Sequence, residues 1–166
     1  HSDQALALLE DASEAERAVL GAIPYQDNEV VLHTDASLLP RRRRAWAAWN
    51  YHVTREPATR VCVTYNMNIL QALAARETVC VTLNRTAAID PQRILRRMNY
   101  QHPVFTSAAV AAQARLSEIN GANQAYFCGA YGRYGFHEDG VVSAEAALDS
   151  FAREGSLAQR ALHRLG

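Results

Sequence analysis

Between residues 29 and 106 the sequence repeats short apolar runs that are separated by short polar connections. The runs are Glu29 to Thr34, Ala45 to Val53, Arg60 to Tyr65, Thr78 to Leu83 and Asn99 to Thr106. Their length and their β-branched and aromatic content are typical of strands. Pro103 cannot donate to a sheet ladder, so the last run should lie at an edge or a bend. The pattern predicts an α+β fold with a mixed, mostly antiparallel sheet covered by helices.

The segments on either side of these runs have helical spacing. Two short helices are expected within residues 2–23, and Ser13 is a good N-cap for the second one because Glu14 and Glu16 follow it. Residues 68–75 have a shorter helical pattern, and Asp90 with Pro91 is a typical helix start. Ser107 is expected to cap an amphipathic helix that ends at Asn120 and Gly121.

The overall composition limits the kinds of partner. Seventeen Lys and Arg balance seventeen Asp and Glu among the 166 residues, so the chain has no net field to attract nucleic acid. The run Arg41 to Arg44 could bind phosphate, but a solvated loop is the better interpretation. No stretch approaches the roughly 20 apolar residues of a membrane span. Three widely spaced cysteines in apolar runs, Cys62, Cys80 and Cys128, are expected to be buried thiols of a cytoplasmic protein.

The most informative segment lies near the carboxyl end. Gln124 to Cys128 is predicted to be a strand, Gly129 to Gly140 a loop rich in glycine and aromatic residues, and Val141 to Leu165 a helix. Glycines let a ligand approach the backbone, and the first turn of a helix offers free N–H groups to an anion or a ring edge. A cofactor would fit such a segment. A glycine-rich surface loop without a ligand is the alternative that the pattern leaves open.

The run Tyr126 to Tyr131, followed by Tyr134 to Val141, resembles the last flavin-binding segment of the flavin-containing amine oxidase superfamily. A narrower resemblance is to bacterial proteins of that superfamily predicted to bind NAD or FAD. It extends over most of the chain. It is carried by Val31 to Asp35, Pro40 with the arginine run, Ala45 to Tyr51, Val63 to Asn68 and His102 to Phe105.

The resemblance implies a role for several residues. Gly129, Ala130 and Tyr131 would pass close to the ribityl and pyrophosphate part of FAD. Asp139, Gly140 and Val141 would place backbone amides near the flavin ring. Tyr131, Tyr134 and Phe136 would line a substrate channel, although loop anchoring by half-buried aromatic side chains is the alternative for these three.

Two departures from the family pattern limit what this chain could do alone. The family's amino-terminal GxGxxG segment, which binds the ADP part of FAD, is absent from the sequence. Ala130 and Tyr131 stand where many relatives have an acidic residue. We therefore expect residues 1–121 to be a substrate-side domain and residues 122–166 to be a strand-loop-helix that belongs to the FAD domain of a longer protein. By itself the chain should bind FAD weakly or not at all. It should also self-associate through its last quarter, because apolar side chains that would pack against the flavin domain lack their cover: Phe127, Val141, Val142, Ala146, Leu148 and Phe151.

The resemblance implies an FAD-dependent oxidoreductase that moves a hydride from an amine or a related small molecule to FAD. No residue qualifies from the sequence as a catalytic acid or base, and no motif has metal-ligand spacing. His33 with Asp35, and His137 with Glu138 and Asp139, are better explained by local hydrogen bonding. A hydrolase is not supported, because the sequence has no GxSxG elbow. The rival hypothesis is a non-catalytic α+β binding or interaction module.

Overall fold

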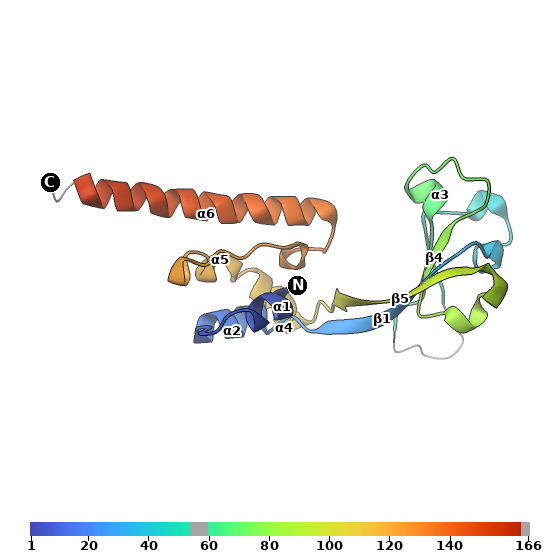
Figure 1. The fold of residues 1–166 in the computed structure, drawn as a ribbon, viewed down its shortest axis with the longest axis horizontal. Helices are drawn as coiled ribbons and strands as arrows, with labels where there is room; N and C mark the ends of the chain where they lie inside the picture. The colour runs from blue at the N-terminus through green and yellow to red at the C-terminus, as the bar shows by residue number, and fades with distance from the viewer. Residues whose placement is uncertain (54–59, 164–166) are drawn as a thin grey trace. The chain divides into compact units, whose positions relative to one another are not determined.

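The structure is a computed structural model that describes residues 1–53 and 60–163, and for residues 156–163 it describes the backbone alone. The chain divides into two compact units (Figure 1). One unit, here the helical unit, contains residues 1–26 and 103–166, and the other, the sheet unit, contains residues 27–102. This division differs from the predicted boundary at residue 121, because residues 122–166 share a unit with the first 26 residues. That the last segment belongs to a flavin domain remains a prediction.

Among the described residues, the sheet has five strands in the order β2-β3-β4-β1-β5. Their bounds are β1 Tyr25–His33, β2 Trp49–Tyr51, β3 Val63–Asn66, β4 Cys80–Leu83 and β5 Ile94–Pro103. The pairs β1 with β4, β2 with β3 and β3 with β4 are antiparallel. The predicted α+β class with a mostly antiparallel sheet is therefore confirmed. β5 reaches Pro103 and lies at one edge of the sheet, as the proline requires.

Side chains alternate along each strand between the two faces of the sheet. Val31 pairs with Thr82, and Thr82 pairs with Thr64, so these residues lie on the same face. All three are fully buried, and Leu38, Ile89 and Ile94 pack against Val31. The opposite face has a separate cluster of Val30, Val63 and Leu83, with Tyr65, Val81 and Met98 packed against it.

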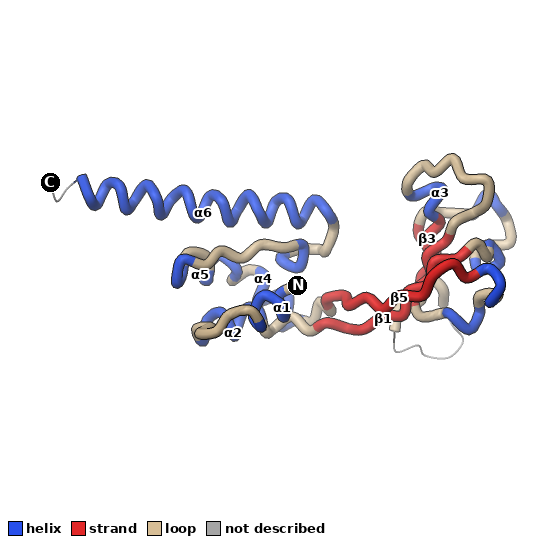
Figure 2. The backbone as a smooth tube through the Cα atoms, viewed as in Figure 1, coloured by secondary structure: helices blue, strands red, loops and turns tan. Residues whose placement is uncertain are grey.

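Short helical turns make most of the connections in the sheet unit (Figure 2). They are the 3-10 turns Ala36–Leu38, Arg43–Ala45, Thr86–Ala88 and Pro91–Arg93, and the single-turn helix α3, Met67–Leu70. Asp90 caps the turn that begins at Pro91, as predicted, because its side chain accepts a hydrogen bond from the Gln92 amide at 3.0 Å. The predicted helix at residues 68–75 is shorter and begins earlier, since Asn66 caps it through the Ile69 amide.

In the part that the structure describes, the helical unit has five α-helices. They are α1 Ser2–Ala7, α2 Glu14–Leu20, α4 Ser107–Gln113, α5 Leu116–Ile119 and α6 His137–His163, with 3-10 turns at Ala122–Gln124 and Ala130–Gly132. Its core joins residues from distant parts of the chain: Val19, Leu20, Ile23, Ala109, Ile119, Phe127 and Tyr131. Within the described residues, no helix is long and apolar enough to cross a membrane.

Several local predictions were wrong. The predicted strand Gln124 to Cys128 is not formed, because Asn123 and Gln124 adopt positive φ angles of 54° and 59° and the Phe127 amide bonds to the Asn120 side chain instead of a strand. The predicted helix after Ser107 is split into α4 and α5, and its cap is Thr106, whose hydroxyl accepts from the Ala109 amide at 3.1 Å. Cys62 and Cys80 are buried as expected, but Cys128 is exposed.

Candidate functional site

The candidate site is the loop–helix junction, defined here as residues 129–143, where an extended segment turns into α6. Ala130 to Gly132 form a 3-10 turn that packs against the beginning of α6. The Gly129 amide donates to the Ser143 hydroxyl at 3.0 Å, so the loop is attached to the second turn of the helix. This contact brings the two predicted cofactor-binding groups, residues 129–131 and 139–141, together.

Gly129 is required by the loop itself. A Cβ atom at this position would lie 2.4 Å from Cε1 of the Tyr131 ring, which is closer than real Cβ atoms approach. The glycine therefore makes room for a neighbouring side chain, and its presence alone does not indicate a ligand. Gly140 is different, because a Cβ atom there would meet only the Ala130 amide nitrogen at 4.0 Å, an ordinary contact distance.

The first turn of α6 is organised by Asp139. Its carboxylate accepts a hydrogen bond from the Phe136 amide at 2.9 Å and lies 3.6 Å from Nε of Arg133. The Asp139 side chain is buried, so this ion pair is partly shielded from water. The carboxylate occupies part of the positive end of the helix, where an external anion would otherwise bind.

The three amides expected to face a flavin ring are not equivalent. The Gly140 amide donates to the Phe136 carbonyl at 3.3 Å, and the Val141 amide lies within the regular ladder of α6. Of the three, only the Asp139 amide is in the first turn of the helix, where the amides have no intrahelical acceptor. The amides available to a ligand are therefore those of residues 137–139, two residues earlier than the group 139–141 that the resemblance implies.

Tyr131 points into the core of the helical unit. Its side chain is only 7% exposed and packs in the cluster that includes Ile119 and Phe127. Among the described residues its hydroxyl has no hydrogen-bond partner. Burial, together with the neighbouring Tyr25 and Cys128, raises the pKa of Tyr131 to about 12. In this arrangement Tyr131 contributes a ring to packing.

Tyr134 and Phe136, the other two predicted substrate residues, have exposed side chains. Tyr134 lines a hollow of about 370 Å³ together with Phe105, Val110, Gln113, Gly132 and Arg133. The hollow combines two aromatic rings with one guanidinium group, so it could hold a flat molecule. Phe136 does not line it.

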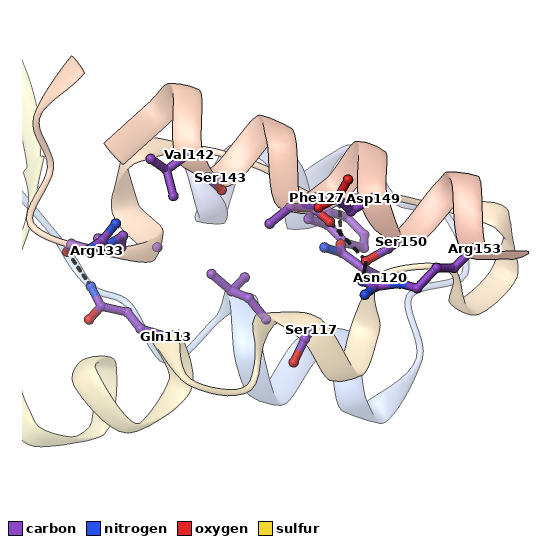
Figure 3. A pocket seen from close by; sticks show the side chains of 13 residues that line it. Gln113, Ser117, Asn120, Phe127, Arg133, Val142, Ser143, Asp149, Ser150 and Arg153 are labelled. Atoms are coloured by element: carbon purple, nitrogen blue, oxygen red, sulfur yellow. Dashed lines mark hydrogen bonds between the residues drawn. The ribbon is translucent and has the colours of Figure 1, made fainter. Parts of the chain in front are cut away.

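A second pocket of about 280 Å³ lies between α5, α6 and the loop (Figure 3). Gln113 and Arg133 lie at one end, and Asn120, Ser150 and Arg153 gather at the other. Leu116, Phe127 and Val142 add apolar surface to its lining. At the second end Arg153 donates to the Ser150 hydroxyl at 3.3 Å.

The sequence analysis missed two residues that hold the loop in place. Gln113, on α4, donates from Nε2 to the carbonyls of Tyr131 and Arg133 at 2.8 and 2.7 Å. The hydroxyl of Ser143, on α6, accepts from the Gly129 amide. Neither could be found from spacing, because each contact joins segments at least fourteen residues apart.

The junction combines backbone amides with several polar side chains. The Arg133 guanidinium group is paired with the buried Asp139 carboxylate, and the side chains of His137 and Glu138 are exposed. In the described part of the chain, no group of three or more His, Cys, Asp or Glu side chains is arranged to hold a metal ion. No protein-family model matches the chain, and no curated protein shows significant similarity to it.

Proposed function

We propose that the chain is the carboxyl-terminal, substrate-side part of an FAD-dependent oxidoreductase of the amine oxidase type. The observation that carries the proposal is the loop–helix junction. The backbone of Gly129 and Ala130 lies against the start of a long helix, and a Cβ atom at Gly140 would meet only the Ala130 amide nitrogen, at 4.0 Å.

The residues of the junction fit one end of the cofactor. The amides of residues 137–139 would face the polar edge of the flavin ring, and Arg133 would balance the charge of Asp139 there. The exposed rings of Tyr134 and Phe136 would contact the substrate. FAD, when bound, would accept the hydride, and the side chains of this chain would orient the substrate and exclude water. The ADP part of FAD would need a partner domain on the amino-terminal side.

The test begins with the natural coding sequence. An in-frame upstream segment with a GxGxxG pattern is expected, and the complete protein should be purified with FAD and show flavin absorbance. The 166-residue chain by itself should be colourless. A colourless complete protein would contradict the proposal and would favour the non-catalytic binding module.

A matched pair of variants tests the junction directly. In the complete protein, Gly140→Leu should lower FAD affinity by tenfold or more, because the new side chain would occupy the surface proposed for the ring; a tenfold loss corresponds to about 1.4 kcal/mol. Gly155→Leu is the control, since it lies in the same helix and a Cβ atom there has nothing within 4 Å. Flavin fluorescence during titration gives both affinities. Equal FAD affinities in the two variants would show that Gly140 is not part of the FAD site.

A further inference from the structure

A chain of hydrogen bonds crosses the buried face of the sheet. Nε2 of His33 lies 2.7 Å from the Thr82 hydroxyl, which lies 2.8 Å from the Thr64 hydroxyl. The Thr64 hydroxyl in turn lies 2.8 Å from Nε2 of His52. His33, Thr64 and Thr82 are completely buried, whereas His52 is partly exposed next to the edge strand β2.

One backbone amide determines which groups donate and which accept in this chain of hydrogen bonds. The Asp35 amide, which can only donate, points at Nδ1 of His33 at 3.1 Å. Nδ1 must therefore be unprotonated, and the ring hydrogen of a neutral His33 is on Nε2, from which it is donated to Thr82. Protonation of His33 would place two donors, Nδ1–H and the Asp35 amide, against each other.

Counting hydrogens extends the argument to His52. Three hydrogen bonds link His33 to His52, and each needs one hydrogen atom. When Nε2 of His52 is the final acceptor, these hydrogens come from His33, Thr82 and Thr64. If Nε2 of His52 is protonated, four hydrogens compete for the same three contacts. One threonine hydroxyl hydrogen would then be buried without an acceptor, because neither hydroxyl has another hydrogen bond in the described structure.

The same chain of hydrogen bonds also attaches β2 to the sheet. Among the described residues this strand pairs with β3 through three residue pairs, Trp49 to Tyr65, Asn50 to Thr64 and Tyr51 to Val63. The Asn50 side chain donates to the Thr64 carbonyl at 3.1 Å, and the His52 amide donates to the Cys62 carbonyl at 2.9 Å. The Thr64–His52 contact therefore joins the residue that directly follows β2 to a residue within β3.

We infer that the His33–Thr82–Thr64–His52 chain is a pH-sensitive latch that holds the edge strand β2 while both histidines are neutral and releases it when His52 is protonated.

The charged neighbours agree with neutral histidines. Burial lowers the pKa of His52, and the guanidinium group of Arg85 lowers it further. Burial also lowers the pKa of His33, and the Asp35 carboxylate opposes this effect. The Asp35 carboxylate accepts hydrogen bonds from the Ser37 and Asp90 amides. Cys80 lies opposite His33 on the neighbouring strand, and burial, with the Asp35 charge, raises the pKa of its thiol to about 11.

Hydrogen exchange of the β2–β3 amides between pH 5 and pH 7.5 tests the latch. A group with a lowered folded-state pKa stabilises the closed form above its ordinary pKa, about 6.5, and this contribution is lost as pH falls. One proton taken up on opening should lower the protection factor of the His52 amide by up to about tenfold per pH unit. Protection in β1 and β4 should change less.

Two variants separate the latch from general acid sensitivity. His52→Gln should remove the pH dependence of β2 protection, whereas His137→Gln, on an exposed residue of the helical unit, should leave it unchanged. Thr64→Val should raise the pKa of His52, measured by NMR titration, because no hydroxyl hydrogen is trapped. Protection that does not vary with pH in the wild type, or a His52 pKa that is the same in Thr64→Val, would overturn the inference.

Discussion

At the scale of single residues, the largest difference from the sequence analysis concerns Tyr131. The resemblance implies contacts with FAD and substrate, but the side chain lies in the helical core with a buried hydroxyl that has no partner among the described residues. A buried polar group without a hydrogen bond costs about 1–3 kcal/mol. The position is therefore suited to an apolar ring of the same shape.

Tyr131→Phe should raise the free energy of unfolding by about 1 kcal/mol, because it removes a polar atom that gains nothing from folding. Tyr25→Phe is the matched control. The Tyr25 hydroxyl accepts from the Ser2 amide at 2.8 Å, so its loss should lower stability by a similar amount. Urea unfolding measures both. A Tyr131→Phe variant less stable than the wild type would show that the hydroxyl has a partner.

At the scale of elements, the caps define where the helices begin. Ser13 accepts from the Glu16 amide at 3.2 Å, and the Glu16 carboxylate accepts from the Ser13 amide at 2.7 Å, which forms a complete capping box. At α4 the cap is one residue earlier than predicted. Thr106 and Ser107 are both good capping residues, so the sequence alone did not distinguish them, and the extended conformation of Thr106, with ψ of 166°, decides the matter.

Alanine substitutions distinguish the two positions. Thr106→Ala should destabilise the helical unit by about 1 kcal/mol, because the Ala109 amide loses its acceptor. Ser107→Ala should change stability by less than about 0.5 kcal/mol, since the residue is already in the first turn, where alanine is favourable. Thermal unfolding followed by circular dichroism measures both variants. A larger effect at Ser107 would restore the predicted cap.

At the scale of the whole molecule, α6 presents apolar side chains that the described residues leave largely exposed. Val141, Leu148 and Phe151 are 54%, 66% and 61% exposed and recur at helical spacing on one side of the helix. Ala146 is also exposed, as predicted, and Val142 is partly covered. Phe127, which we expected to lack cover, is buried in the helical core, so this part of the expectation was wrong.

The exposed stripe on α6 should cause the chain to self-associate, because contiguous apolar surface is favourable to bury. Replacing Leu148 and Phe151 by Glu should shift the chain toward monomer in light scattering across a concentration series. Leu8→Glu is the control, since Leu8 is exposed in the same unit but outside the stripe. A wild-type chain that stays monomeric at high concentration would contradict the prediction.

The sequence by itself determined the features that depend on a few neighbouring residues. The Ser13 capping box, the Asp90–Pro91 start and the reversal at Gly121, where φ is 93°, follow from side-chain chemistry within three or four positions. The apolar runs also overlap all five strands and the long final helix, because hydrophobic periodicity is visible in a single sequence. The last run was misplaced, since β5 begins at Ile94 and ends at Pro103 whereas the prediction ran from Asn99 to Thr106.

Only the tertiary structure decided which of these segments meet. Nothing in the runs themselves indicates that β1 pairs with β4, some fifty residues away, or that residues 103–166 join the first 26. Residues 124–128 have the composition of a strand, yet the Phe127 amide bonds to the Asn120 side chain and the Phe127 ring packs in the helical core. The Gln113 and Ser143 anchors of the loop–helix junction arise in the same way. Such outcomes depend on competition among distant partners, which local spacing does not record.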